Sequence, residues 1–292
     1  MKRKRKKLRP FDIINIFILG GFALLIILPF VHILFASISD PNYVRSAKGL
    51  ILFPYQATFK GYQMVFQNKG VFRSILNSVF YMVAGTTINM VLSLMGAYVL
   101  SRKNLPYRKV LMIFITIPMF FGAGVIPLYL LLNNLSMINT IWAILLPGAI
   151  SPWNMIILKN AFDTVPDEVI ESAKVEGAGH FYIFTKVCIP LIKPTIAIIT
   201  LYYAVYHWND WFLAMAFVQD RDWYPLQLIV RELLVINDTS QLVPGGMTNI
   251  ETLNYGCLIK YSTTIVSMIP MMLLYPLVQK YFTKGILVGS IK

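Results

Sequence analysis

Charged residues are scarce in this sequence. Of its 292 residues, 13% are Asp, Glu, Lys or Arg, whereas 57% are hydrophobic. A soluble domain usually has about 25% charged residues, and a soluble fold of this length could not bury so much apolar surface. The composition therefore excludes an ordinary soluble protein. It indicates a protein of the bilayer, which an apolar run of roughly 20 residues crosses as a helix.

Cysteine and the motifs of ATP hydrolysis are also lacking. The two cysteines, Cys188 and Cys257, have no metal-ligand spacing, and the topology predicted below places them on opposite sides of the membrane. We therefore expect neither a metal site nor an intramolecular disulfide. No Gly-Lys dipeptide occurs, which excludes a phosphate-binding P-loop on this chain. No Ser/His/Asp arrangement is found, so no catalytic residue is assigned and no enzyme is expected.

Positive charge is plentiful but confined to short segments. The net charge of +13 is also found in nucleic-acid-binding proteins, yet here Lys and Arg flank apolar runs, as the positive-inside rule requires. Seven basic residues between Met1 and Pro10 precede the apolar run Ile13–Ala36. That run is too long for a signal peptide, and no small-residue cleavage site follows it. We interpret residues 1–12 as a basic cytoplasmic N-terminus and the run as the first transmembrane helix.

Six apolar runs predict an all-α membrane domain over residues 13–292. Prolines interrupt several of them, which is tolerated where neighbouring helices or a cavity satisfy the freed backbone groups. Six spans from an inside N-terminus put both termini in the cytoplasm. Most of the 26 Lys and Arg residues then lie inside, although the first outer loop, Asp40–Arg73, is basic too. The expected spans are Ile13–Ala36, Ser74–Leu100, Val110–Leu132, Ile138–Leu158, Thr195–Val218 and Ser262–Phe282.

The long inner loop, residues 159–194, contains a predicted surface helix. Asp163 or Thr164 is expected to cap its N-terminus, and Gly177 is expected to end it. A second short helix is predicted around His180–Lys186. Small residues at the bend between the two helices would permit close approach by another protein.

The same loop carries a recognisable motif. Residues 171–178 read Glu-Ser-Ala-Lys-Val-Glu-Gly-Ala, and Ile189-Pro190 follows them. This segment resembles the EAA loop of ABC-importer permeases, in which Glu-Ala-Ala, two variable residues and Asp-Gly-Ala precede an apolar stretch ending in Leu-Pro. Ser172 here stands for the first alanine, Glu176 for the aspartate and Ile189 for the leucine, and all three changes are mild. The alternative is an ordinary surface helix with a solvated acidic face.

The resemblance extends to the carbohydrate-importer permeases of the maltose-transporter type, over about residues 12–290. It rests further on Asn77-Ser78, on Ala-Tyr-Val-Leu-Ser-Arg at 97–102, on Trp-Asn-Asp-Trp-Phe at 208–212 and on Lys284-Gly285. It implies a six-helix type I ABC-importer permease fold with a coupling helix at about Pro166–Gly177. It also implies a homologous second permease, an ATPase dimer that binds the ATP and Mg²⁺, and an extracellular solute-binding protein as partners.

The resemblance assigns roles within the inner loop as well. A cleft of the ATPase would bind the coupling helix, with Glu171 paired to a basic group and Gly177 allowing the bend. Closure of the ATPases on ATP would turn the permease pair from inward-facing to outward-facing. The implied ATPase-coupling residues are Glu168, Glu171, Ser172, Ala173, Glu176, Gly177 and Ala178.

Candidates for the substrate pathway lie mainly on the expected fifth span. An ionisable group inside a span is costly and usually faces a cavity or a partner, which singles out Asp210. Aromatic rings stack on sugars, and amides bind their hydroxyls. The candidates are Tyr206, Trp208, Asn209, Asp210 and Trp211, together with Asn77 on the second span.

A structural explanation of these residues stays open. Trp208 and Trp211 would then be interfacial aromatics, and Asp210 would cap or pair with a neighbouring helix. The polar residues of the second span would hydrogen-bond between helices; they are Asn77, Thr87 and Asn89.

Other functions also stay open. An ABC-importer permease for a non-sugar solute, such as a peptide, would have the same inner loop and would differ in what its binding protein binds. A secondary transporter would often show inverted repeats and ion-binding carboxylates within the membrane, and a membrane enzyme would show clustered catalytic groups; neither pattern is found. The sequence does not name the sugar. An oligosaccharide is expected from the family, and the basic first outer loop suits either an acidic saccharide or an acidic binding protein.

Overall fold

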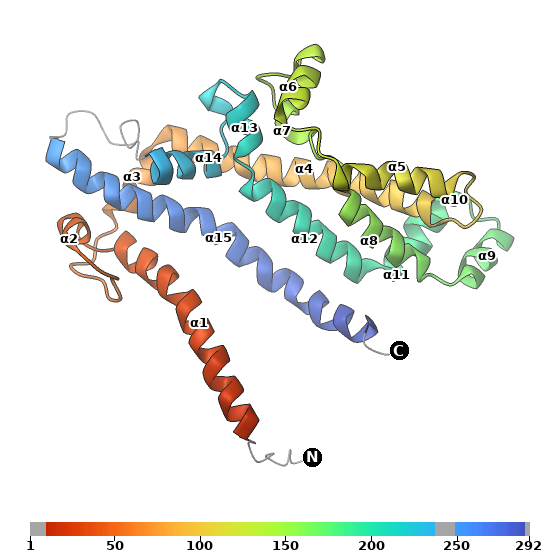
Figure 1. Cartoon of the computed structure of the whole chain (residues 1–292), viewed down its shortest axis with the longest axis horizontal. Coiled ribbons are helices and arrows are strands. Elements are labelled where there is room, and N and C mark those ends of the chain that lie inside the picture. The colour runs from red at the N-terminus through yellow and green to blue at the C-terminus, as the bar shows by residue number, and fades with distance from the viewer. Residues whose placement is uncertain (1–9, 237–248, 290–292) are drawn as a thin grey trace. The chain divides into compact units, whose positions relative to one another are not determined.

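The computed structural model describes residues 10–236 and 249–289, and this part of the chain consists of helices joined by turns, without a strand (Figure 1). The chain divides into two compact units. The first unit comprises Met1–Lys69 and Glu232–Met268, and the second comprises Gly70–Arg231 and Ile269–Lys292. Most of the predicted basic N-terminus lies outside the described residues.

The first unit packs short segments around the C-terminal end of α1 (Pro10–Ser37). Its buried core is formed by Ala36, Val44, Ile51 and Leu258. Over the rest of its length α1 exposes its apolar side chains, which is typical of a helix surrounded by lipid. The other elements are α2 (Pro41–Ser46), α3 (Lys60–Gln67), η3 (Glu232–Ile236) and the first part of α15 (Asn249–Gly289).

The second unit is organised along α4 (Lys69–Ser101), which has buried side chains over its whole length. One buried cluster contains Tyr98 and Phe162, and another contains Tyr81 and Leu228. The remaining elements are α5 (Arg108–Phe120), α6 (Val125–Asn134), α7 (Trp142–Leu145), α8 (Pro152–Asp163), α9 (Asp167–Val175), α10 (His180–Tyr182), the π-helical turn η1 (Ile183–Cys188), α11 (Ile189–Leu191), α12 (Lys193–Asn209), α13 (Phe212–Phe217), the 3-10 turn η2 (Arg221–Trp223), α14 (Leu226–Arg231) and the last part of α15.

Three described segments are long and apolar enough to cross a membrane, namely α1, α4 and Tyr255–Leu274 of α15. Two further pairs of helices pass the same test together but are bent. The bend is 117° between α5 and α6, and 87° between His180–Leu191 and Lys193–Asn209. These segments overlap the first, second, third, fifth and sixth expected spans.

The fourth expected span, Ile138–Leu158, is divided between α7 and α8. Gly148, between the two helices, has a φ of +78°, which only glycine adopts at little cost. Pro152 then begins α8, and Ser151 Oγ accepts a hydrogen bond from the backbone N–H of Asn154. Length and composition therefore support three to five spans, and the total of six stays a prediction.

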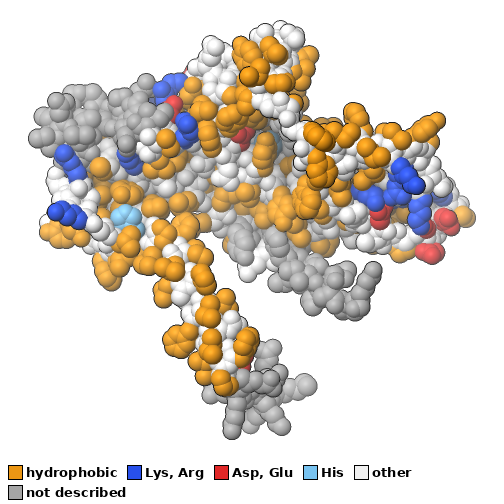
Figure 2. Space-filling model, in the orientation of Figure 1, with side chains coloured by type: hydrophobic (Ala, Val, Ile, Leu, Met, Phe, Trp, Pro, Cys, Tyr) orange, Lys and Arg blue, Asp and Glu red, His pale blue; other side chains and the backbone are white. Residues whose placement is uncertain are grey.

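Charged side chains gather at the end of the second unit that carries α9, while hydrophobic side chains cover the flanks of its helices (Figure 1, Figure 2). This contrast is what a membrane domain requires, because its flanks meet hydrocarbon and its ends meet water. A charged group at the centre of the bilayer is costly. The end that carries α9 is therefore a surface in contact with water.

Candidate coupling loop and substrate pathway

The helix predicted in the inner loop is present as α9. It begins directly after Pro166, whose φ of −59° and ψ of 136° lead the chain into the first turn. Asp167 and Glu168 lie in that turn, where the positive end of the helix dipole favours carboxylates. We refer to residues 159–194 as the coupling loop, after the role that the resemblance implies for them.

The predicted N-terminal cap of this helix is wrong. Neither Asp163 nor Thr164 caps α9, because α8 continues to Asp163 and both side chains are engaged there. The carboxylate of Asp163 pairs with Lys159 and lies 3.6 Å from Arg108 Nη2. Thr164 Oγ1 donates to the carbonyl of Ala161 at 2.7 Å. The sequence did not reveal that α8 extends so far into the loop.

The C-terminus of α9 forms a Schellman motif around Gly177, which has a φ of +82°. The N–H of Gly177 donates to the carbonyl of Lys174, and that of Ala178 donates to Ala173, both at 2.9 Å. These two bonds satisfy the last free carbonyls of the helix. The prediction that Gly177 ends the helix is confirmed.

The two faces of α9 differ in character. Ile170 is buried, and Ala173 and Ala178 pack against the cluster that contains Tyr98. These two small residues therefore meet the core of the protein itself, whereas Gly177 and Gly179 are exposed. Val175 faces outward and is 89% exposed. Val175 was not among the predicted coupling residues. Those that are exposed are Glu168, Glu171, Ser172, Glu176 and Gly177.

Three aromatic rings from three elements form part of that cluster. The ring centroids of Tyr98 and Phe184 are 5.0 Å apart, those of Tyr98 and Phe162 are 5.6 Å apart, and those of Phe162 and Phe184 are 6.1 Å apart. Such pairs contribute about 0.5–1.5 kcal/mol each beyond their burial. Because α9 packs on the same cluster, its position is linked to α4, α8 and η1.

A second connection between α9 and the rest of the unit is ionic. Lys103, in the turn that follows α4, donates to Asp167 Oδ2 at 2.6 Å. This hydrogen bond, together with the attraction between the charges, raises the pKa of Lys103 and lowers the pKa of Asp167. Both side chains are more than half exposed, so the pair adds little to stability. Its main effect is to position the first turn of α9.

The expected fifth span is interrupted at Asp210, between α12 and α13. Asp210 Oδ1 accepts hydrogen bonds from the backbone N–H of Phe212 at 3.1 Å and of Leu213 at 3.4 Å. Its Oδ2 is buried without a hydrogen-bond partner among the described residues. Asp210 therefore caps α13, as the structural explanation predicted, and keeps one oxygen uncommitted.

The neighbouring candidates at this α12–α13 break have different surroundings. Trp208 is 1% exposed, whereas Tyr206 is 45% exposed. The side-chain amide of Asn209 donates to the carbonyl of Val205 within α12. The Trp211 ring is half-buried, with the guanidinium carbon of Arg231 4.5 Å from its centroid. Trp208 is thus a core residue in this conformation, while Tyr206 and Trp211 are accessible.

A buried polar pair joins α4 to α12 just before the break. His207 Nε2 lies 2.9 Å from Asn89 Oδ1, and Asn89 Nδ2 donates to the carbonyl of Gly148 at 3.0 Å. The prediction of hydrogen bonding between helices is confirmed for Asn89. The imidazole packs directly on the backbone of α4 at Gly85, where a Cβ atom would overlap the ring.

The same prediction fails for Thr87 and is confirmed for Asn77. Thr87 Oγ1 donates to the carbonyl of Val83 within α4, so the predicted bond to another helix is wrong. The amide of Asn77 donates to the carbonyls of Asp222 and Tyr224, at 2.8 and 3.1 Å, and so attaches α4 to the segment around η2. The assignment of Asn77 to the substrate pathway stays a prediction.

Comparison with known proteins now identifies the family. Residues 89–288 match the model of a family described as "Binding-protein-dependent transport system inner membrane component". The chain belongs to this family. Both the coupling loop and the α12–α13 break lie within the matched residues, so both are parts of the inner membrane component itself.

Relatives of this inner membrane component match over nearly the whole chain. The polygalacturonan/rhamnogalacturonan transport system permease protein YtcP of Bacillus subtilis (strain 168) is 38% identical, over 98% of this chain and 99% of its own. Protein LplC of the same organism is 35% identical, over 97% and 95%. A crystal structure of a bacterial ABC transporter involved in the import of the acidic polysaccharide alginate matches with a TM-score of 0.87 at 31% identity, over 96% of this chain and 100% of that chain. The predicted ABC-importer permease fold is confirmed.

Reasoning from the sequence missed several residues of this inner membrane component. Val175 occupies a variable position of the motif, and Lys103 stands among other basic residues, so neither had a distinguishing signal. Arg231 lies far in sequence from Trp211, which it contacts. Gly85 is one of 17 glycines, and only the packed imidazole of His207 reveals its role.

Proposed function

We propose that this chain is a permease subunit of an ABC importer that moves an oligosaccharide across the cell membrane, with ATP hydrolysed on a separate ATPase dimer. The observation that carries the proposal is α9. Its exposed acidic face and Val175 are free to enter a cleft of a partner, while its inner face is packed on α4, α8 and η1. A partner that moves α9 therefore moves these elements too.

The coupling residues divide into two groups in this proposal. Glu168, Glu171, Ser172 and Glu176 contact the ATPase, with Glu171 paired to a basic group. Ala173, Gly177 and Ala178 act by holding α9 on its core and by turning the chain after it. ATP and Mg²⁺ bind to the ATPase, and both termini of the permease lie in the cytoplasm.

The other partners follow from the family. A homologous second permease completes the pathway, and an extracellular solute-binding protein delivers the sugar. The family is described as the inner membrane component of binding-protein-dependent transport. An alginate ABC transporter has been crystallised with an oligosaccharide-bound periplasmic protein, and it shares the fold at 14% identity with a TM-score of 0.55.

The substrate that we infer is an acidic oligosaccharide. The name of YtcP specifies polygalacturonan and rhamnogalacturonan, and the matching crystal structure is that of an importer of alginate, an acidic polysaccharide. At the α12–α13 break, Arg231 stacks on Trp211, and no carboxylate of the described residues lies within ion-pair distance of it. A guanidinium on an indole offers a charge for a sugar carboxylate beside a ring for stacking. These observations do not favour a peptide substrate.

The test is ATP hydrolysis by the assembled importer in nanodiscs with its binding protein. Oligogalacturonate, a neutral oligosaccharide of the same length and a peptide are compared as stimulants. We expect oligogalacturonate to stimulate most. Stimulation by the peptide alone would contradict the whole proposal. Stimulation by the neutral oligosaccharide alone would contradict the acidic substrate, but it would agree with the proposal that the chain is a sugar permease.

The coupling role is tested in the same assay with Glu171→Lys. Losing a charge pair in a docked cleft costs about 2–5 kcal/mol, so stimulated hydrolysis should fall more than about tenfold. Lys109→Glu reverses an exposed charge in α5, outside the coupling loop, and should retain stimulation. Normal coupling by Glu171→Lys would show that α9 is not the transmitting element.

A further inference from the structure

We propose that the coupling-loop end of α4 binds one anionic phospholipid of the inner leaflet. The acyl chain lies in an apolar groove along α4, and the headgroup lies beside Arg102 in the polar cavity that adjoins the groove. The proposal rests on the proposed function in one respect, the placement of the coupling loop at the cytoplasmic surface.

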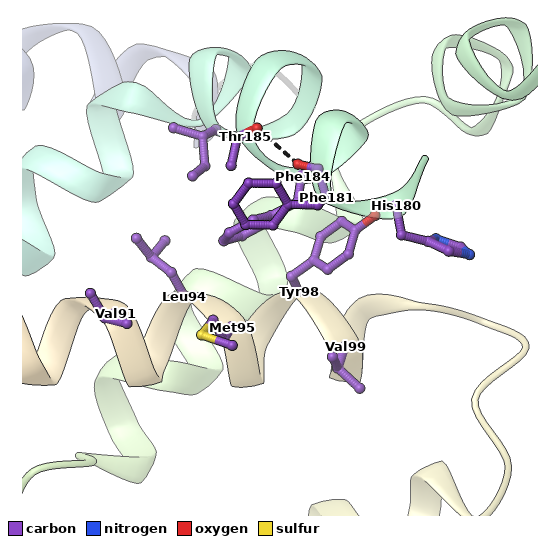
Figure 3. A pocket seen from close by; sticks show the side chains of 10 residues that line it. Val91, Leu94, Met95, Tyr98, Val99, His180, Phe181, Phe184 and Thr185 are labelled. Atoms are coloured by element: carbon purple, nitrogen blue, oxygen red, sulfur yellow. Dashed lines mark hydrogen bonds between the residues drawn. The ribbon is translucent and has the colours of Figure 1, made fainter. Parts of the chain in front are cut away.

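The groove has a volume of about 430 Å³ and is lined almost entirely by hydrocarbon and aromatic side chains (Figure 3). One wall is the last part of α4, from Val91 to Val99, and the other is formed by Phe181, Phe184 and the following turn. The wall on α4 spans nine residues, and their Cα atoms extend over about 12 Å along the helix axis. One leaflet of hydrocarbon is roughly 15 Å thick, so the groove matches most of an acyl chain.

The groove is open rather than filled by the protein itself. Val91 is 50% exposed, and Phe181 is 78% exposed. Tyr98 points from α4 toward Phe181 and Phe184, at the end of the groove that is next to His180 (Figure 3). An apolar ligand in the groove would therefore contact the ring cluster that also supports α9.

A polar cavity of about 510 Å³ adjoins this end of the groove, and His180 lines both. Two of its cations already have acidic partners, since Lys103 pairs with Asp167, and Arg108 shares Asp163 with Lys159. Its other charged side chains are those of Arg102, Lys174 and Glu171.

Arg102 stands at the junction of groove and cavity. Its guanidinium carbon lies 4.5 Å from the centroid of the Tyr98 ring, and its Nη2 donates to Ser101 Oγ at 2.8 Å. No carboxylate of residues 10–236 or 249–289 is recorded within ion-pair distance of it. The charge of Arg102 is thus available to a ligand, directly beyond the last apolar residues of the groove.

An anionic phospholipid fits the apolar groove and the adjoining charge of Arg102 better than other ligands do. A free anion would leave the groove unfilled, and an apolar helix of another subunit would leave Arg102 without a counter-charge. Basic pockets between helices on the cytoplasmic side are known to bind anionic headgroups. The occupant that satisfies both parts is an acyl chain joined to a phosphate.

The test measures lipid binding to the full chain in detergent by native mass spectrometry. Dioleoyl phosphatidylglycerol is compared with dioleoyl phosphatidylcholine and with glycerol 3-phosphate, which has no acyl chain. We expect phosphatidylglycerol to bind most tightly and glycerol 3-phosphate not to displace it. Equal binding of the two lipids, or displacement by glycerol 3-phosphate, would overturn the proposal.

Two variants with matched controls locate the site. Arg102→Gln removes one interfacial charge, which corresponds to about fivefold weaker binding of phosphatidylglycerol, and Lys109→Gln removes a charge outside the cavity. Val91→Trp fills the groove and should weaken binding by a similar factor, while Val83→Trp alters another exposed valine of α4 that does not line it. If the controls weaken binding as much as the variants, the lipid is held by the general charge and surface of the chain and the site does not exist.

Discussion

At the coupling loop, the acidic side chains of α9 and Val175 are exposed to water, while Ile170 and Ala173 face the core. At the α12–α13 break, polar groups are instead held inside the unit. Asn89 and His207 meet there in a buried contact, and Asp210 caps a helix with one oxygen while burying the other. Changes at the exposed surface should therefore act on partner contacts, and changes at the enclosed one on stability.

The largest effect on stability is expected for Gly85→Val, at the enclosed region. The new side chain would overlap the His207 imidazole, and overpacking a core costs about 1–3 kcal/mol. The thermal unfolding midpoint of the full chain in detergent should fall clearly, and His207→Ala in the same chain should restore part of the loss.

Gly20→Val is the matched control for this comparison. Gly20 lies within α1, where a Cβ atom would meet no atom within 4 Å, so the substitution changes helix propensity without overlap. Equal destabilisation by Gly85→Val and Gly20→Val would show that the close approach of His207 to α4 does not limit stability.

A smaller effect, on coupling, is expected for Gly177→Ala at the exposed region. A non-glycine residue in the left-handed conformation costs roughly 1–2 kcal/mol, and open space around Gly177 adds no overlap. Gly177→Asn is the control, since asparagine tolerates this conformation. In the hydrolysis assay, the alanine variant should lose more sugar stimulation than the asparagine variant. The reverse order would contradict the role of the backbone turn.

The smallest effect is expected from the Lys103–Asp167 pair and depends on pH. The pKa of Asp167 is lowered, so its contribution is present above the unfolded pKa of about 3.9 and is lost as the pH falls through the folded value. The pKa of Lys103 is raised, so its contribution is present below about 10.4 and is lost as the pH rises through the folded value.

The contribution of the pair should thus be constant between roughly pH 4 and pH 10. The difference in unfolding midpoint between wild type and Lys103→Gln checks this, and it should shrink as the pH falls below about 4. Lys109→Gln supplies the control for a lost surface charge. A difference that grows as the pH falls would have the wrong sign for this pair.

Much of the coupling loop could be predicted, because its signals are local. A glycine that ends a helix and acidic residues in a first turn act within a few residues, and both Gly177 and the acidic start of α9 are found where expected. The error at Asp163 arose from competition: two cations, one of them from α5, bind its carboxylate. A local sequence pattern does not show the partner from α5, which is Arg108.

The enclosed region could be predicted only in part, because its contacts join distant residues. Asn89 and His207 are 118 positions apart, and hydropathy does not show that they meet. Asp210 was recognised as unusual, since a carboxylate in an apolar run has few explanations. Its place at the end of α12 depends on how α13 turns away, which follows from packing rather than from composition.

The bend between His180–Leu191 and Lys193–Asn209 has a consequence for how movement is transmitted through this segment. The two segments meet at 87°. A displacement along the axis of His180–Leu191 is therefore directed across the axis of Lys193–Asn209. The π-helical turn η1 lies within His180–Leu191, and such turns are frequent at functional sites in helices. A displacement of the coupling loop would therefore tilt α12, which ends directly before Asp210.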